Sequence, residues 1–267
     1  MTKNQKVIKY LAIAFAFCLI AAIVSGIANG LTFLTGMTDK SDSEGKVQEF
    51  SVGENAKYLN IDLANSDLII KEGDKFAVET TKGNIIAREK LGSFSVTEKN
   101  SVIENSEEGQ TVITVPKGYV FNKIDIDTGK GSLIADVLNS KKVYLDFGAG
   151  EVVIDNLISA EDTEIDGGAG KVTIKDGKIC DADFDMGAGR LDVTAEITGN
   201  SDFDCGVGNV SINLKGKEEN YKLKINKGFG AVTIKGEVVS DGTVYGNGPH
   251  TIEADGGVGE IKIDFVK

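Results

Sequence analysis

Hydrophobic and polar residues alternate along most of the chain beyond residue 50, in short runs that lie on either side of closely spaced glycines. In one copy, Val143, Leu145 and Phe147 precede the glycines, and Val152 and Ile154 follow them. Strict alternation is typical of a strand that buries one face. Each copy therefore predicts two short strands around a glycine corner.

The corner phrase recurs along the chain as an acid or its amide, a variable residue, and then Gly-x-Gly. Its first glycines stand at positions 129, 148, 168, 187, 206, 228 and 257, so successive steps are 19, 20, 19, 19, 22 and 29 residues. A two-strand unit cannot bury its apolar side alone, whereas stacked units share one core. The predicted fold is all-β, a β-solenoid of about 19-20-residue repeats over residues 123–267. The predicted structural corner glycines are Gly129, Gly131, Gly148, Gly150, Gly168, Gly170, Gly187, Gly189, Gly206, Gly208, Gly228, Gly230, Gly257 and Gly259.

Residues 50–122 are predicted to form an amino-terminal β capping region with a degenerate repeat. The repeat is YLNIDLANSDLIIKEGD (58–74), in which DLANS replaces the corner phrase. The strands that follow it are predicted to be joined by hairpins or loops such as Lys82-Gly83-Asn84. This region is expected to cover the end of the solenoid, because an open edge would offer unpaired strands to other chains.

Residues 10–37 contain no charged side chain, and about 20 apolar residues are enough to span a bilayer. Lysines precede this stretch and several acids follow it, which by the positive-inside rule places residues 1–9 as a cytoplasmic tail. The prediction is a single-pass cell-membrane protein. Residues 38–49 form its linker, and the rest of the chain is extracytoplasmic.

A cleaved signal peptide is the alternative for the same segment, with small residues Gly26 and Ala28 at a cleavage point. Hydrophobicity resumes at Leu31 and Phe33, which favours an uncleaved anchor. A lipoprotein signal at Cys18 is disfavoured, because a bulky Phe17 precedes this cysteine.

Composition narrows the classes of function. The 267 residues include 29 basic and 41 acidic side chains, a net charge of −12, which disfavours nucleic acid as a partner. One His and 3 Cys do not suit the common zinc sites, and no cofactor is predicted. In register, Cys180 and Cys205 lie about 20 Å apart along a strand, beyond the reach of a disulfide. Both are predicted to be free, buried thiols.

Stacked coils would align the acidic residue of each corner phrase in one column, with a second acidic column two residues earlier. Like charges about 5 Å apart repel one another unless something compensates them. Either each carboxylate accepts hydrogen bonds from the backbone of its own corner, or the strip recruits Ca²⁺ or a cationic polymer. A catalytic carboxylate pair for glycoside cleavage is a third interpretation. The first column consists of Asp127, Asp146, Asp166, Asp185, Asp204 and Asp255, with Asn226 in one copy, and the second contains Asp125, Glu164, Asp183, Asp202 and Glu253.

Other catalytic signatures are not supported. His250 is the one imidazole of the chain, and it stands in an irregular insertion, 241–251, with no nucleophile signature beside it. The glycine phrase at 168–171 lacks the Gly-Lys-Ser/Thr of a phosphate-binding loop. We therefore predict no catalytic residue, and a solvated loop histidine.

The segments NIDLANSDLIIKEGD and VPKGYVFNKIDIDTGKGSL (115–133), together with the GAG-centred repeats, resemble the bacterial putative-adhesin family of unknown function. The likeness covers about residues 48–267. It implies an amino-terminal membrane segment joined to a β-solenoid, and it carries over no catalytic residue. The resulting hypothesis is a membrane-anchored extracytoplasmic structural or binding module of the cell envelope, with an envelope protein or polysaccharide as its partner. The alternatives are a polysaccharide-acting enzyme and a calcium-binding surface domain.

Overall fold

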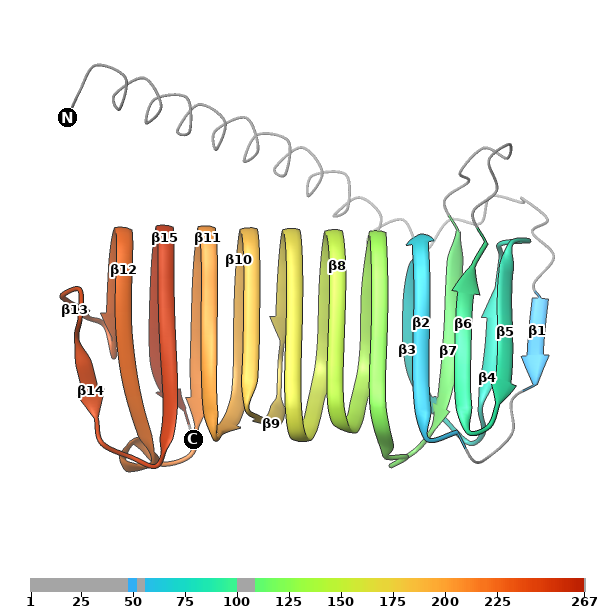
Figure 1. The fold of residues 1–267 in the computed structure, drawn as a ribbon, viewed down its shortest axis with the longest axis horizontal. Coiled ribbons are helices and arrows are strands. Elements are labelled where there is room, and N and C mark those ends of the chain that lie inside the picture. The colour runs from blue at the N-terminus through green and yellow to red at the C-terminus, as the bar shows by residue number, and fades with distance from the viewer. Residues whose placement is uncertain (1–47, 52–55, 100–108, 267) are drawn as a thin grey trace, which may run out of the picture. The chain divides into compact units, whose positions relative to one another are not determined.

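Figure 1 shows the strands wound as successive coils that stack side by side. The computed structural model describes residues 48–51, 56–99 and 109–266. The predicted tail and transmembrane segment, and the linker up to residue 47, lie outside the described residues. Among the residues that are described, no helix is long and apolar enough to cross a membrane.

All regular elements of the described chain are strands except one short 3₁₀ turn. The amino-terminal strands are β1 (Gln48–Ser51), β2 (Tyr58–Asn65), β3 (Asp67–Gly73), β4 (Ala77–Thr80), β5 (Ile85–Lys90), β6 (Ser93–Glu98) and β7 (Gln110–Pro116). The remaining elements are β8 (Phe121–Ile174), β9 (Gly177–Cys180), β10 (Ala182–Thr198), β11 (Asn200–Lys215), η1 (Glu218–Asn220), β12 (Tyr221–Ile234), β13 (Glu237–Val239), β14 (Val244–Gly246) and β15 (His250–Val266).

The coils pair in parallel, one repeat apart, through the middle of the solenoid. Strand β8 runs through three corners, and its last coil pairs with β10 from Thr163↔Ala182 to Ile174↔Val193. Strand β10 then pairs in parallel with β11 in the same register. The all-β solenoid predicted from the glycine spacing is the fold observed.

Apolar side chains inside the coils stack on their counterparts in the neighbouring coils. Phe184 and Phe203, one repeat apart, have ring centroids 4.6 Å apart and an interplanar angle of 11°. The residues that follow the corners form further ladders that are fully buried, as at Leu191 and Val193. Because the apolar side chains of each coil pack against those of the neighbouring coils, one continuous core extends along the stack.

The carboxyl-terminal coils do not follow the order of the sequence. Strand β15 lies between β11 and β12 and is parallel to both, with Asn200↔Thr251 on one side and Tyr221↔His250 on the other. The short strands β13 and β14 pair antiparallel with the outer edge of β12. That edge is then occupied, so the chain returns on the inner side of β12 (Figure 1).

The amino-terminal end is built in a similar way. The coil formed by β2 and β3 lies between the first coil of β8 and a coil formed by β6 and β7. Strand β5 adds antiparallel to β6, and β4 adds antiparallel to β7. Strands β4 and β5 therefore do not pair with each other, and of the two connections predicted for Lys82-Gly83-Asn84, a hairpin or a loop, the structure has the loop.

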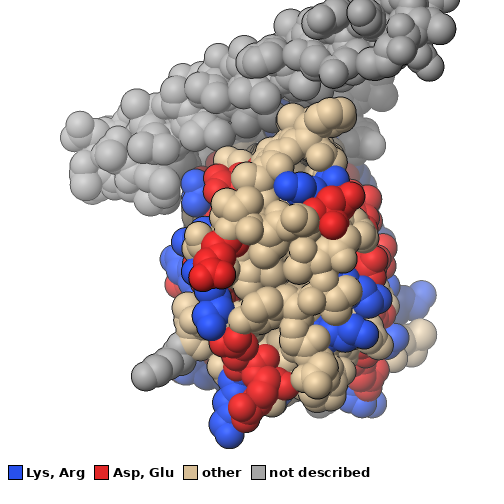
Figure 2. Space-filling model, turned by 90° about the vertical axis from the view of Figure 1, so that its left-hand side faces the viewer, with Lys and Arg blue, Asp and Glu red and all other residues tan. Residues whose placement is uncertain are grey.

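Strand β1 corrects one predicted boundary, because Gln48 and Glu49, which were assigned to the linker, pair with β4. Both ends of the solenoid thus finish in antiparallel strands, which protects the edges of the parallel coils. Figure 2 shows the β12–β14 end, where uncharged residues cover the middle and charged residues lie to both sides. The large apolar side chains exposed near this end include Phe229, Val238 and Val244.

Candidate functional site

The register brings the predicted acidic residues together on one outward face of the coils. Asp166 lies beside Asp185, Asp185 beside Asp204, and Asp204 beside Asp255. The column ends at one side with Asn226. At its other side the degenerate repeat continues it, since Asp62 lies beside Asp127. We call the outward residues that precede the corners, in both columns, the acidic face.

The second column is interrupted by a tyrosine that the sequence analysis did not single out. Tyr144 occupies the position of the acids in neighbouring coils, and its hydroxyl donates a 2.7 Å hydrogen bond to Asp162. Lys123 Nζ lies 4.4 Å from the centroid of its ring. The hydrogen bond to Asp162 raises the pKa of Tyr144 to about 12. The 19- and 20-residue steps put position 144 in register with Asp125 and Glu164, so the repeat spacing is the sequence signal for this tyrosine.

Charge compensation differs between the two sides of the corners. After the corners, outward charges pair across coils, as in Lys171–Glu151 at 3.2 Å and Lys175–Asp155 at 2.6 Å. On the acidic face, the ion pairs that the second column makes with other described residues lie near its ends, Lys123–Asp125 and Lys224–Glu253. Within the described residues, no lysine or arginine forms an ion pair with a first-column aspartate. Among the residues with a described placement, the middle of the acidic face therefore has no compensating ion pair.

The crowding of carboxylates shifts their protonation. Partial burial, followed by repulsion from Asp255 and Asp202, raises the pKa of Asp204 to about 6. Burial and neighbouring carboxylates also raise the pKa values of Asp127 and Asp166 above the usual range. These shifts mean that the charged form of each group is disfavoured in the folded state.

The raised pKa values predict an unusual dependence of stability on pH. A folded pKa above the unfolded value means that the native state binds more protons between about pH 4 and pH 6, so stability falls as pH rises through this window. Asp204→Asn should therefore stabilise the protein at pH 7.5 by about 1 kcal/mol after solvent screening, or about 2–4 °C in melting temperature. The gain should vanish at pH 3.5, as thermal denaturation at the two pH values will show.

Asp155→Asn is the matched control for this variant, since it also neutralises one carboxylate but on the compensated side. It should not stabilise the protein at either pH. Equal stabilisation by both variants would indicate that net charge, and not the crowding of the acidic face, sets the effect.

The expected hydrogen bonds from the corners to the first column are not formed among the described residues. Asp255 Oδ1 is buried and has no hydrogen-bond partner in this part of the chain. One ligand atom each from Asp202, Asp204 and Asp255 lies within 4.8 Å of the other two. Three convergent carboxylates can bind a hard cation such as Ca²⁺. They come together because β15 is inserted beside β11.

Shallow hollows lie on either side of this cluster. One hollow, of about 560 Å³, is lined by Asp185, Asp204, Asp255, Asn226 and Asp241 among others. A second, of about 450 Å³, lies over the second column and includes Asp183 and Asp202. The part of the acidic face formed by β10, β11, β15 and β12 is thus accessible to a ligand.

The remaining candidate residues have structural surroundings. Both described cysteines are free, but Cys180 is only half-buried, whereas Cys205 is buried as predicted. His250 is the first residue of β15 and is not in a loop, and its Nδ1 accepts a 3.1 Å hydrogen bond from the amide of Gly199. The imidazole thereby helps to dock β15 on the preceding coil.

The protein is thus a parallel β-solenoid, and the acidic face on its coils lacks balancing ion pairs along its middle, among the residues that are described. Residues 56–244 match the model of the Toastrack DUF4097 family, and the chain belongs to that family. No curated protein matches the chain significantly.

Several solved structures are similar to the chain. A putative cell adhesion protein from Clostridium sporogenes ATCC 15579 is 18% identical, with 83% of this chain and 99% of that chain covered and a TM-score of 0.37. A putative adhesin from Parabacteroides distasonis ATCC 8503 is 14% identical, with coverages of 84% and 98% and a TM-score of 0.43. A putative lipid binding protein from the same organism is 12% identical, with coverages of 86% and 100% and a TM-score of 0.34.

Proposed function

We propose that the chain is a membrane-anchored, extracytoplasmic binding module of the cell envelope that acts through its acidic face. The observation that carries this proposal is the asymmetry of charge. Outward charges on the other side of the corners pair across coils, whereas first-column aspartates lack basic partners within the described chain. Charges of like sign without ion-pair partners lower the stability of the fold. Proteins keep such destabilising groups chiefly at functional sites.

The chemistry of the acidic face favours a partner with regularly spaced positive charges. Neighbouring coils place carboxylates about 4.8 Å apart along the column, on a rigid strand framework. A cationic segment of an envelope protein or a cationic polymer laid along the column would neutralise several carboxylates at once. The same array would repel anionic lipid head groups and nucleic acid.

A lysine decapeptide serves as the probe for this function. The double variant Asp166→Asn/Asp185→Asn should weaken its binding by about tenfold, measured by calorimetry in low salt. Glu151→Gln/Asp155→Asn removes the same number of charges from the compensated side and should change affinity by less than about twofold. Equal losses in both double variants would show that only net charge attracts the peptide, and would refute the proposal.

Divalent-cation binding is the second candidate function, favoured by the convergence of Asp202, Asp204 and Asp255. It would supply the partner that the buried Asp255 Oδ1 lacks among the described residues. Titration with Ca²⁺ in the same calorimeter should then give heat that Asp255→Asn abolishes. No heat, and an unchanged melting temperature in millimolar Ca²⁺, would rule this candidate out.

The membrane anchor is a separate part of the proposal and rests on the uncharged segment 10–37. A cysteine placed at Ser43 should react with an impermeant reagent on intact cells. Labelling that requires cell lysis would place the solenoid on the cytoplasmic side.

A further inference from the structure

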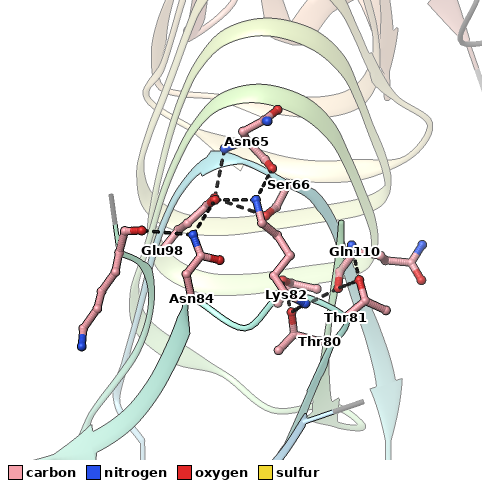
Figure 3. Close-up of polar contacts among 10 residues, drawn as sticks. Asn65, Ser66, Thr80, Thr81, Lys82, Asn84, Glu98 and Gln110 are labelled. Atoms are coloured by element: carbon pink, nitrogen blue, oxygen red, sulfur yellow. Dashed lines mark hydrogen bonds and ion pairs between the residues drawn. The ribbon is translucent and has the colours of Figure 1, made fainter. Parts of the chain in front are cut away.

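The Gly-x-Gly corners of successive coils lie in a row, which we call the corner stack, and the degenerate corner of residues 62–66 stands at its amino-terminal end. A buried ion pair lies at this end, and neither of its residues belongs to the acidic face. Lys82 follows β4, and Glu98 is the last residue of β6. Their side chains are only 8% and 6% exposed, and they form a salt bridge (Figure 3). A buried pair of charges is costly to form, so its retention calls for a specific role.

The pair contacts the backbone of the degenerate corner. Glu98 Oε2 accepts a 3.0 Å hydrogen bond from the amide of Asn65, and Lys82 Nζ donates a 2.6 Å hydrogen bond to the carbonyl of the same residue. The hydroxyl of Ser66 also donates to Glu98. The carboxylate of Glu98 thus accepts from the N–H of Asn65, and the ammonium group of Lys82 donates to its C=O.

In a parallel ladder, the N–H and C=O of one residue point to the same neighbouring strand. The carbonyls of Ala64 and Ser66 face the next coil, at Gly129 and Gly131. The backbone groups of Asn65 therefore point the other way, toward the position where the coil of β6 and β7 would place its own corner. That coil has no Gly-x-Gly between its two strands, and Lys82 and Glu98 contact Asn65 from there.

Gly109, just before β7, lies where the side chain of Lys82 leaves no room for a Cβ. A Cβ at this position would lie 2.2 Å from Lys82 Cγ and 2.8 Å from Lys82 Cδ. The lysine stem therefore fills the room that a side chain at residue 109 would take. Hydrogen bonds from Lys82 and from the amides of Asn65 and Asn84 outweigh the effect of burial, and they keep the pKa of Glu98 below its usual range.

We infer that the Lys82–Glu98 pair replaces a missing corner and closes this end of the corner stack against a second copy of the chain. Without the pair, the N–H and C=O of Asn65 would have no hydrogen-bond partner among the described residues, and unpaired groups of this kind are where another strand pairs. A Gly-x-Gly corner fits beside such a backbone, as every inner coil shows, and the chain itself carries seven of them. With the pair in place, both backbone groups of Asn65 are hydrogen-bonded and offer a second copy no free donor or acceptor.

The test uses the full chain, purified in a mild detergent, with Lys82→Met/Glu98→Leu. Apolar replacement of both partners avoids leaving one buried charge unpaired. The amide of Asn65 should exchange with solvent at least about tenfold faster than in the parent protein. The variant should also associate as its concentration rises, as sedimentation velocity will measure.

Two further variants keep the result unambiguous. Gly109→Ala displaces the lysine stem but retains both charges, and it should give the same two changes even if the double variant does not fold. Lys123→Met/Asp125→Leu removes an ion pair that is exposed on the acidic face, and it should give neither change. Unchanged exchange at Asn65, or faster exchange without association, would overturn the inference.

Discussion

Gly189→Ala is expected to unfold the solenoid at room temperature or to destabilise it by at least about 4 kcal/mol. Gly189 has a φ of +144°, and a Cβ there would lie 1.8 Å from the carbonyl oxygen of Gly170 in the neighbouring coil. The obstacle is backbone, so no side chain can turn away to make room. Relief requires the two coils to separate, which would break their ladder on both sides of the corner.

Gly83→Ala provides the control for this substitution. No atom lies within 4 Å of a Cβ built at Gly83, which stands in the connection between β4 and β5. Urea denaturation of both variants should show a parent-like midpoint for Gly83→Ala and a large loss for Gly189→Ala. A melting temperature within 2 °C of the parent for Gly189→Ala, by the scale of about 2–4 °C per kcal/mol, would contradict the close packing of the corners.

Deleting residues 250–267 is expected to release β12, β13 and β14 from the solenoid while the inner coils stay folded. Strand β15 is the parallel partner of both β11 and β12, and its buried side chains include Ile252, Ile261 and Ile263. Each contributes about 1.5–3 kcal/mol, so the local loss should exceed about 4 kcal/mol. Hydrogen exchange should show unprotected amides throughout β12 and slower exchange from β10 inward.

A synthetic peptide covering residues 250–267 supplies the matching rescue. Added in excess, it should pair between β11 and β12 and restore protection to both strands. The exposed edge of β11 should make the truncated protein prone to association in the absence of the peptide. Full protection of β12 without the peptide would mean that β12 can pair with β11 directly, contrary to the observed strand order.

The central coils could be predicted because their evidence is local and repeated. Every copy carries the same alternation around Gly-x-Gly, so the 19-residue register of β8, β10 and β11 follows from spacing alone. The acidic columns followed from the same register. Tyr144 obeys this spacing too, but a column defined by acidic residues gives no signal at the copy that carries an aromatic side chain.

The ends of the solenoid could not be predicted in this way. Spacing placed Asn226 beside Asp204, whereas the fold places Asp255 there, 51 residues along the chain from its neighbour. The hydrogen bonds expected between corner and carboxylate also did not form among the described residues. Lys82 and Glu98 gave no sequence signal, since a lone lysine in a polar connection and a glutamate at a strand end are typical of exposed positions.

The sequence by itself determined the all-β class, the repeat length, the buried ladders and the acidic columns, because stacked identical units translate sequence spacing directly into spatial register. Only the tertiary structure decided which coils are neighbours at each end, which carboxylates converge, and which side chains contact the backbone of the degenerate corner at Asn65. The order of neighbouring strands depends on which backbone edges are already paired. Strands β13 and β14 pair with the outer edge of β12, for example, and β15 therefore pairs with its inner edge. Such competition for an edge is a property of the folded chain, and no local pattern of residues records it.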